Sequence, residues 1–121
     1  MEAIETLAAR ARRSGRPYLE FLRVPAMSAG VYVLPAEGVD RQSAHLEDEV
    51  YHVVRGRATF THRGSERSVG PGDVLFVPAH DAHRFHSIEA ELVVLVVFAP
   101  AESPPTPARP SDGSGDPTRE T

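Results

Sequence analysis

Short apolar runs separated by turn residues occupy most of this chain, and they predict β-structure between Tyr18 and Phe98. The expected strands cover residues 18–23, 28–34, 50–55, 57–62, 66–69, 74–77, 83–87 and 92–98. Glycine, proline and polar residues lie between these runs and are typical of turns. Many short strands at nearly regular spacing, with no helical pattern between them, predict an antiparallel β-sandwich or a closed barrel.

The beginning of the chain has a helical pattern instead. Apolar residues recur at spacings of three and four, at Ile4, Leu7, Ala8 and Ala11. This pattern predicts an amphipathic helix over residues 2–13 that ends at Ser14-Gly15. Because its apolar stripe is partly alanine, we expect the helix to cover a sheet edge outside the barrel.

The end of the chain is rich in proline and small polar residues, and beyond Pro100 it has no apolar residue larger than alanine. Such a segment cannot bury enough surface to offset the entropy lost on ordering. It is therefore predicted to be a disordered tail without a role in folding. The expected organisation is a helix over 1–14, a β-barrel over 15–99 and a tail over 100–121.

The composition limits the chemistry. A chain of 121 residues suffices for one domain with a modest core. With no cysteine, neither a disulfide nor a thiolate metal site can form, so any metal must be held by histidine nitrogen and carboxylate oxygen. No apolar run approaches the ~18 residues of a membrane span, and the first residues lack the apolar core of a signal peptide. We therefore expect a cytoplasmic protein with no membrane partner.

The charge gives no reason to expect a nucleic-acid partner, because the formal net charge is −4. All thirteen basic residues are arginine, which fits a GC-rich bacterial genome better than a binding role. The absence of lysine excludes a lysine Schiff base.

The six histidines all fall within residues 45–86, inside the β-rich part. Period-two alternation places Glu49 and Tyr51 on one face of a strand and His52 on the other. His83 shares a face with Phe85, which turns Arg84 away. The side chains that can converge are therefore His45, Glu49 and His83.

The neighbouring residues have simpler explanations. Glu47 and Asp48 are expected to form a solvated acidic turn at the rim of the barrel. The larger aromatic residues are expected in the core, namely Phe60, Phe76, Phe85 and Phe98.

Two spacings carry a resemblance. Three residues separate His45 from Glu49, and six more lead from Glu49 to Gly56. Gly72 is followed by "DVLFV", Pro78, "AHDA" and His83. These stretches resemble the two cupin motifs, G-x5-H-x-H-x3–4-E-x6-G and G-x5-P-x-G-x2-H-x3-N. The resemblance implies an all-β fold, an antiparallel double-stranded β-helix or jelly-roll barrel, with one short N-terminal helix.

The departures from these motifs concern the metal site. Ser43 stands where the first motif has its first histidine, and Gln42 could fill that place if a bulge shifts the register. His80 replaces the glycine of the second motif and Ser87 its final asparagine. The ligand set that the resemblance implies is His45, Glu49 and His83, with Gln42 as a candidate fourth ligand. The divalent ion could be Fe, Zn, Mn or Ni, because these ligands do not choose between them.

The resemblance implies a metal-dependent enzyme acting on a small molecule, of dioxygenase, cyclase or isomerase, or lyase type. The alternative is a barrel that binds or senses a small ligand without catalysis. Tyr51 is the candidate catalytic residue, as a general acid or as a group that orients a metal-bound substrate. A homodimer is expected, because barrels of this family commonly pair and Val50 and Val54 face outward.

Overall fold

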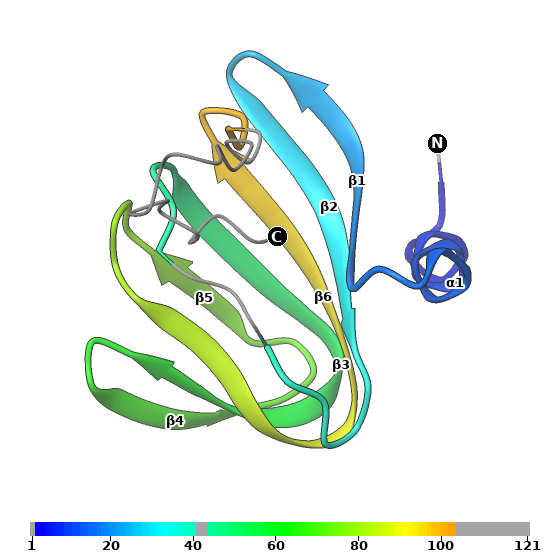
Figure 1. Ribbon diagram of the computed structural model, residues 1–121, viewed down its shortest axis with the longest axis vertical. Helices are drawn as coiled ribbons and strands as arrows, with labels where there is room; N and C mark the ends of the chain where they lie inside the picture. The colour runs from blue at the N-terminus through cyan, green and yellow to red at the C-terminus, as the bar shows by residue number, and fades with distance from the viewer. Residues whose placement is uncertain (1, 41–43, 104–121) are drawn as a thin grey trace, which may run out of the picture.

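The computed structural model describes residues 2–40 and 44–103 of the chain (Figure 1). One helix, α1 (Ile4–Ser14), precedes six strands. These are β1 (Tyr18–Val24), β2 (Met27–Leu34), β3 (Asp48–His62), β4 (Ser65–Val69), β5 (Val74–Val77) and β6 (His83–Ala99). The strands pair in antiparallel fashion, as predicted. No helix in the described part of the chain is long and apolar enough to cross a membrane.

Two pairs of predicted strands are single long strands. The runs 50–55 and 57–62 form β3, and the runs 83–87 and 92–98 form β6. Gly56, expected to be a turn, instead bends β3 at a φ of 100°, and the register with β6 shifts between Val53 and Thr59. A Cβ atom on Gly56 would lie 2.3 Å from the carbonyl oxygen of Glu91. Glycine therefore lets the two strands approach each other where they bend.

The long strands β3 and β6 take part in both walls of the barrel. Near Glu49, β3 pairs with β5 on one side and with β6 on the other, and β6 continues to β2 and β1. Near Phe60, β3 pairs with β4 and with the first residues of β6. Figure 1 shows β3 and β6 curving away from β1 and β2 toward β4. This arrangement is the jelly-roll, or double-stranded β-helix, fold.

The core fills the space inside the barrel and includes the buried rings of Tyr51, Phe60, Phe85 and Phe98. The prediction that Phe76 also belongs to the core is wrong, because 57% of its surface is exposed. Its neighbours on β5, Leu75 and Val77, are the residues that face inward. Alternation along β5 therefore places Phe76 on the outer surface.

Helix α1 packs on the outer face of the sheet rather than along an edge, which corrects the prediction. Its buried residues Leu7, Ala8 and Ala11 form a second apolar cluster with Val31, Val33 and Val93. These valines belong to β2 and β6, which are interior strands of the sheet. The small alanines allow the helix to approach the sheet closely. Arg12 and Arg55 also form ion pairs with Glu91, at 2.8 and 3.1 Å.

A row of apolar residues crosses the outer face away from the helix. The register aligns one residue from each of β1, β2, β6, β3 and β5, namely Leu22, Ala29, Val97, Val50 and Phe76. Leu22, Val50 and Phe76 are exposed. We call this set the outer-face row.

The first residues of the predicted tail pack against the barrel. We call Ala101–Ser103 the closing segment. The backbone N–H of Ala101 donates to the carbonyl of Pro25, and that of Glu102 donates to the buried Ser28 hydroxyl at 2.8 Å. The prediction of a disordered tail does not describe this segment, because polar groups of the barrel accept hydrogen bonds from its backbone. The rest of the predicted tail, residues 104–121, lies outside the described residues.

Candidate metal centre

Three parts of the chain bring His45, Glu49 and His83 together inside the barrel. His45 lies in the loop before β3, Glu49 lies on β3, and His83 begins β6. One ligand atom from each lies within 4.8 Å of the other two. All three side chains are buried, with exposed fractions of 2%, 1% and 5%. The prediction that these residues converge is confirmed.

Strand alternation and loop contacts explain their orientation. Glu49 and Tyr51 alternate with the outward-facing Val50 on β3, so both point inward. The loop that carries His45 is held by the loop between β5 and β6, because the N–H of His80 donates to the carbonyl of His45 at 2.6 Å. His80 has a φ of 74°, a conformation that glycine adopts most readily. The second motif has glycine at this position, and Ser87, which replaces its asparagine, also has a positive φ of 52°.

A backbone contact fixes the ring of His83. Its Nδ1–H donates to the carbonyl oxygen of Asp81 at 2.9 Å. This leaves Nε2 facing the site, 3.1 Å from Oε1 of Glu49 and 3.1 Å from the hydroxyl of Tyr51. Metal-binding histidines are commonly oriented by such an acceptor behind the ring.

The environment shifts the protonation of this pair. Burial raises the pKa of Glu49, and hydrogen bonding to His83 only partly offsets the effect. Burial lowers the pKa of His83, but the hydrogen bond and the charge of Glu49 outweigh it, so the net shift is upward. Both shifts favour a proton on this pair, at the place where a metal ion would bind.

The charged groups around the site favour a cation. Among the described residues, the buried acidic and basic side chains are Asp40, His45, Glu47, Glu49, His83 and Glu102, and none is an arginine. Buried carboxylates are stabilised by hydrogen bonds or by a positive charge. Asp40, for example, accepts from the hydroxyl of Tyr32 at 2.6 Å and from the N–H of Phe85 at 2.8 Å. A divalent ion would compensate the acidic interior at Glu49.

The two residues of the predicted acidic turn, Glu47 and Asp48, differ in exposure, which the prediction did not anticipate. Asp48 is exposed, as expected, and accepts from the N–H of Ala79. Glu47 is buried rather than solvated, because its carboxylate accepts two hydrogen bonds from Ser103. The buried acids Asp40 and Glu102 were not predicted. Neither lies in a strand with a periodic pattern, so no sequence signal indicated its burial.

The remaining predicted site residues have different outcomes. Tyr51 is completely buried and faces the site, as alternation indicated. Gln42 and Ser43, the candidates for the missing ligand, lie outside the described residues.

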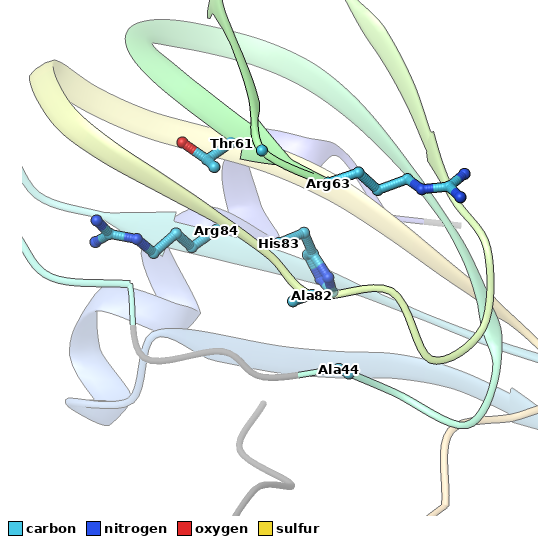
Figure 2. Close-up of a pocket in the computed structure, with 7 residues that line it drawn as sticks. Ala44, Thr61, Arg63, Ala82, His83 and Arg84 are labelled. Atoms are coloured by element: carbon cyan, nitrogen blue, oxygen red, sulfur yellow. The ribbon is translucent and has the colours of Figure 1, made fainter.

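A cleft of about 440 Å³ opens beside His83. Figure 2 shows His83 between Arg63 and Arg84, whose side chains extend away from it in opposite directions. Ala44 and Ala82 border the same cleft. The cleft can therefore admit a small molecule at the edge of the site, and neither guanidinium reaches into the centre.

Comparison with known proteins identifies a family and a close relative. The family model described as the cupin domain matches residues 30–98, a span that contains His45, Glu49 and His83. An uncharacterized protein of Streptomyces coelicolor is 50% identical over 99 residues, which cover 82% of this chain and 93% of that protein.

Solved structures share the barrel. KdgF from a Halomonas species superposes with a TM-score of 0.64 at 24% identity, over 69% of this chain and 76% of that one. The DMSP lyase DddQ from Ruegeria pomeroyi superposes with a TM-score of 0.60 at 23% identity, over 70% of this chain. This chain spans 48% of the lyase. At these identities, the similarity shows a shared fold.

Proposed function

This chain belongs to the cupin domain family, and from that membership we propose that it is a metal-dependent enzyme acting on a small molecule. The ion would be held by His45, Glu49 and His83. The observation that carries this proposal is the convergence of two imidazoles and one carboxylate within 4.8 Å in the barrel interior. The acidic surroundings and the cleft beside His83 support it.

The ligand set suits an open site. Two imidazoles and one carboxylate leave coordination positions for water or substrate, and they suit Fe, Zn, Mn and Ni alike. A bound ion would supply a Lewis acid or, in the case of Fe(II), a site for oxygen activation. Dioxygenase, cyclase or isomerase, and lyase reactions are all compatible with such a centre. A lyase, DddQ, is among the barrels of similar fold.

Tyr51 has the geometry of a hydrogen-bond donor in this site. Its hydroxyl lies 3.1 Å from Nε2 of His83. Complete burial raises the pKa of Tyr51 well above its ordinary value, so the phenol stays neutral. We therefore assign Tyr51 the role of donating a hydrogen bond to a substrate oxygen beside His83, rather than of removing a proton.

The experiment for this proposal is metal analysis of the purified protein alongside His45→Ala, Glu49→Ala and His83→Ala. His86→Ala is the matched control, because His86 lies on the outer side and bonds the hydroxyl of Thr61 at 2.8 Å. We expect about one ion per chain in the wild type and in the control, and little in the three site variants. A wild-type protein that stays metal-free after incubation with Fe, Zn, Mn and Ni salts would contradict the proposal.

The second candidate function is a barrel that binds or senses a small ligand without turning it over. The cleft beside His83 suits this function as well as the first, because such a cleft serves binding whether or not reaction follows. Incubating the metal-loaded protein with a panel of small metabolites separates the two functions. Product formation or oxygen consumption supports the enzyme, whereas saturable binding with unchanged ligand supports the binding barrel.

A further inference from the structure

We propose that Glu102 is a positioning residue of the metal centre, which makes the closing segment part of the site. Its carboxylate lies behind the ring of His45 and sets which ring nitrogen faces the ion. The effect of Glu102 on metal affinity rests on the proposed function, whereas its effect on the tautomer of His45 does not.

The contacts of His45 define this role. Nδ1 lies 3.6 Å from Oε2 of Glu102, whereas Nε2 lies 3.8 Å from Oε1 of Glu49. A carboxylate beside Nδ1 favours the tautomer with the proton on that nitrogen. The lone pair of Nε2 is then directed toward Glu49 and His83. The carbonyl of Asp81 fixes the tautomer of His83 through a hydrogen bond, whereas Glu102 acts on Nδ1 of His45 through its charge at 3.6 Å.

The ring of His45 is also confined sterically. It packs edge-on against Phe98, with the ring centroids 5.0 Å apart. The side chain of His45 is 1% exposed and that of Glu102 is 11% exposed. The carboxylate therefore acts on Nδ1 in a place from which water is largely excluded, where such an interaction is strong.

The backbone of Glu102 is held independently of its carboxylate. Its N–H donates to the Ser28 hydroxyl at 2.8 Å, and its carbonyl accepts from Arg23 at 2.7 Å. The next residue, Ser103, donates to Glu47 through its N–H at 3.0 Å and its hydroxyl at 2.7 Å. These contacts anchor the segment on both sides of Glu102. Its carboxylate oxygen Oε2 lies 3.6 Å from Nδ1 of His45.

Glu102 lies beyond the residues that match the family, which end at position 98. The two motifs therefore do not include this group.

The test compares Glu102→Ala and Glu102→Gln with the control Ser103→Ala, which loosens the segment but keeps the carboxylate. Long-range ¹H–¹⁵N NMR of the metal-free protein at about pH 8, where unshifted imidazoles are neutral, reports the tautomer of His45. Titration with Zn²⁺ reports the affinity of the centre. Thermal melting of each metal-free variant confirms that it is folded.

We expect the Nδ1–H tautomer in the wild type and in Ser103→Ala, and a shift toward Nε2–H in Glu102→Ala. Zn²⁺ affinity should fall about 10- to 100-fold in Glu102→Ala. Glu102→Gln should lose less, because its amide oxygen keeps a partial negative charge beside Nδ1. The Glu102→Gln variant also remains informative if Glu102→Ala does not fold.

An unchanged His45 tautomer and unchanged Zn²⁺ affinity in both Glu102 variants would overturn the inference. A wild-type protein that binds no metal would contradict the proposed function alone. In that case the His45 tautomer still tests the role of Glu102. A change of tautomer in Glu102→Ala supports that role, and an unchanged tautomer overturns it.

Discussion

Nε2 of His83 lies 3.1 Å from Oε1 of Glu49, and both side chains are enclosed by the barrel. Burial raises the pKa of Glu49, and the charge of Glu49 contributes to a net upward shift of the His83 pKa despite burial. The metal-free pair therefore retains a proton over a wider pH range than free side chains do. Metal ions bind the deprotonated ligands, so protons and metal compete for one place.

The metal-free protein should lose stability as the pH rises from about 5 to about 8. The folded-state pKa of Glu49 lies above its unfolded value near 4.3, so its contribution is full below that value and is lost as the pH rises through the folded pKa. His83 acts in the same direction, because its raised pKa makes its contribution full below about pH 6.5 and lost above the folded value. Urea denaturation at several pH values measures this.

Glu49→Gln is the control for that pH dependence, since it removes the carboxylate that raises the pKa of His83. The variant should show a flatter dependence of unfolding free energy on pH. Added Zn²⁺ should stabilise the wild type more at pH 8 than at pH 5. Equal pH slopes in the wild type and the variant would show that the pair does not control the dependence.

The Glu49 and Asp48 carboxylates should differ in their effect on metal binding. Asp48 is exposed at the start of β3, whereas Glu49 is buried among the candidate ligands. A metal ion at a concentration a hundredfold above its Kd stabilises the folded state by ~2.7 kcal/mol. This corresponds to a rise in Tm on the order of 10 °C. We expect Asp48→Asn to keep this rise and Glu49→Gln to lose most of it. Differential scanning fluorimetry with and without metal measures the effect, and equal rises would exclude Glu49 as a ligand.

The different burial of Glu47 and Asp48 shows what could not be predicted from the sequence. Alternation correctly placed Glu49 and Tyr51 inward, because side chains of a paired strand must face opposite sides. Glu47 precedes β3, where no such constraint applies, and its burial depends on Ser103, which is 56 positions away in the chain. The motif spacings likewise located the three candidate ligands but gave no indication of Glu102. The contacts between the closing segment and the barrel depend on the fold rather than on a local pattern.

Tyr51→Phe should keep metal but weaken the binding of an anion at the centre. The change removes the hydroxyl beside His83 and leaves the packed ring. A hydrogen bond to a charged group contributes about 1.5–3 kcal/mol, so acetate should bind the Co²⁺-loaded variant about tenfold more weakly or worse. The visible absorption of Co²⁺ during an acetate titration measures this. Tyr32→Phe is the control, since that hydroxyl donates to Asp40, and equal losses in both variants would contradict a specific role for Tyr51.

The outer-face row should form the interface of a homodimer. Leu22, Val50 and Phe76 expose apolar surface on one face of the sheet, which suits burial against a second copy. Phe76→Asp should yield a folded monomer, whereas Val39→Asp, at an exposed residue outside the row, should remain dimeric. Light scattering after size-exclusion chromatography at micromolar concentration measures the mass. A monomeric wild type would refute the dimer, and a dimeric Phe76→Asp would place the interface elsewhere.

Gly56 should be far less tolerant of substitution than Gly64, although both have positive φ angles, 100° and 79°. A side chain on Gly64 would meet nothing within 4 Å, so Gly64→Ala should cost about 1–2 kcal/mol for the left-handed backbone alone. A Cβ on Gly56 would collide with the carbonyl oxygen of Glu91 at 2.3 Å, in the place where β3 bends across β6. Overpacking typically adds about 1–3 kcal/mol. Urea denaturation of the two alanine variants measures the difference. Equal losses would mean that β3 and β6 can separate at the bend, and that the glycine seven positions beyond Glu49 is required for its φ angle and not for the close approach of the strands.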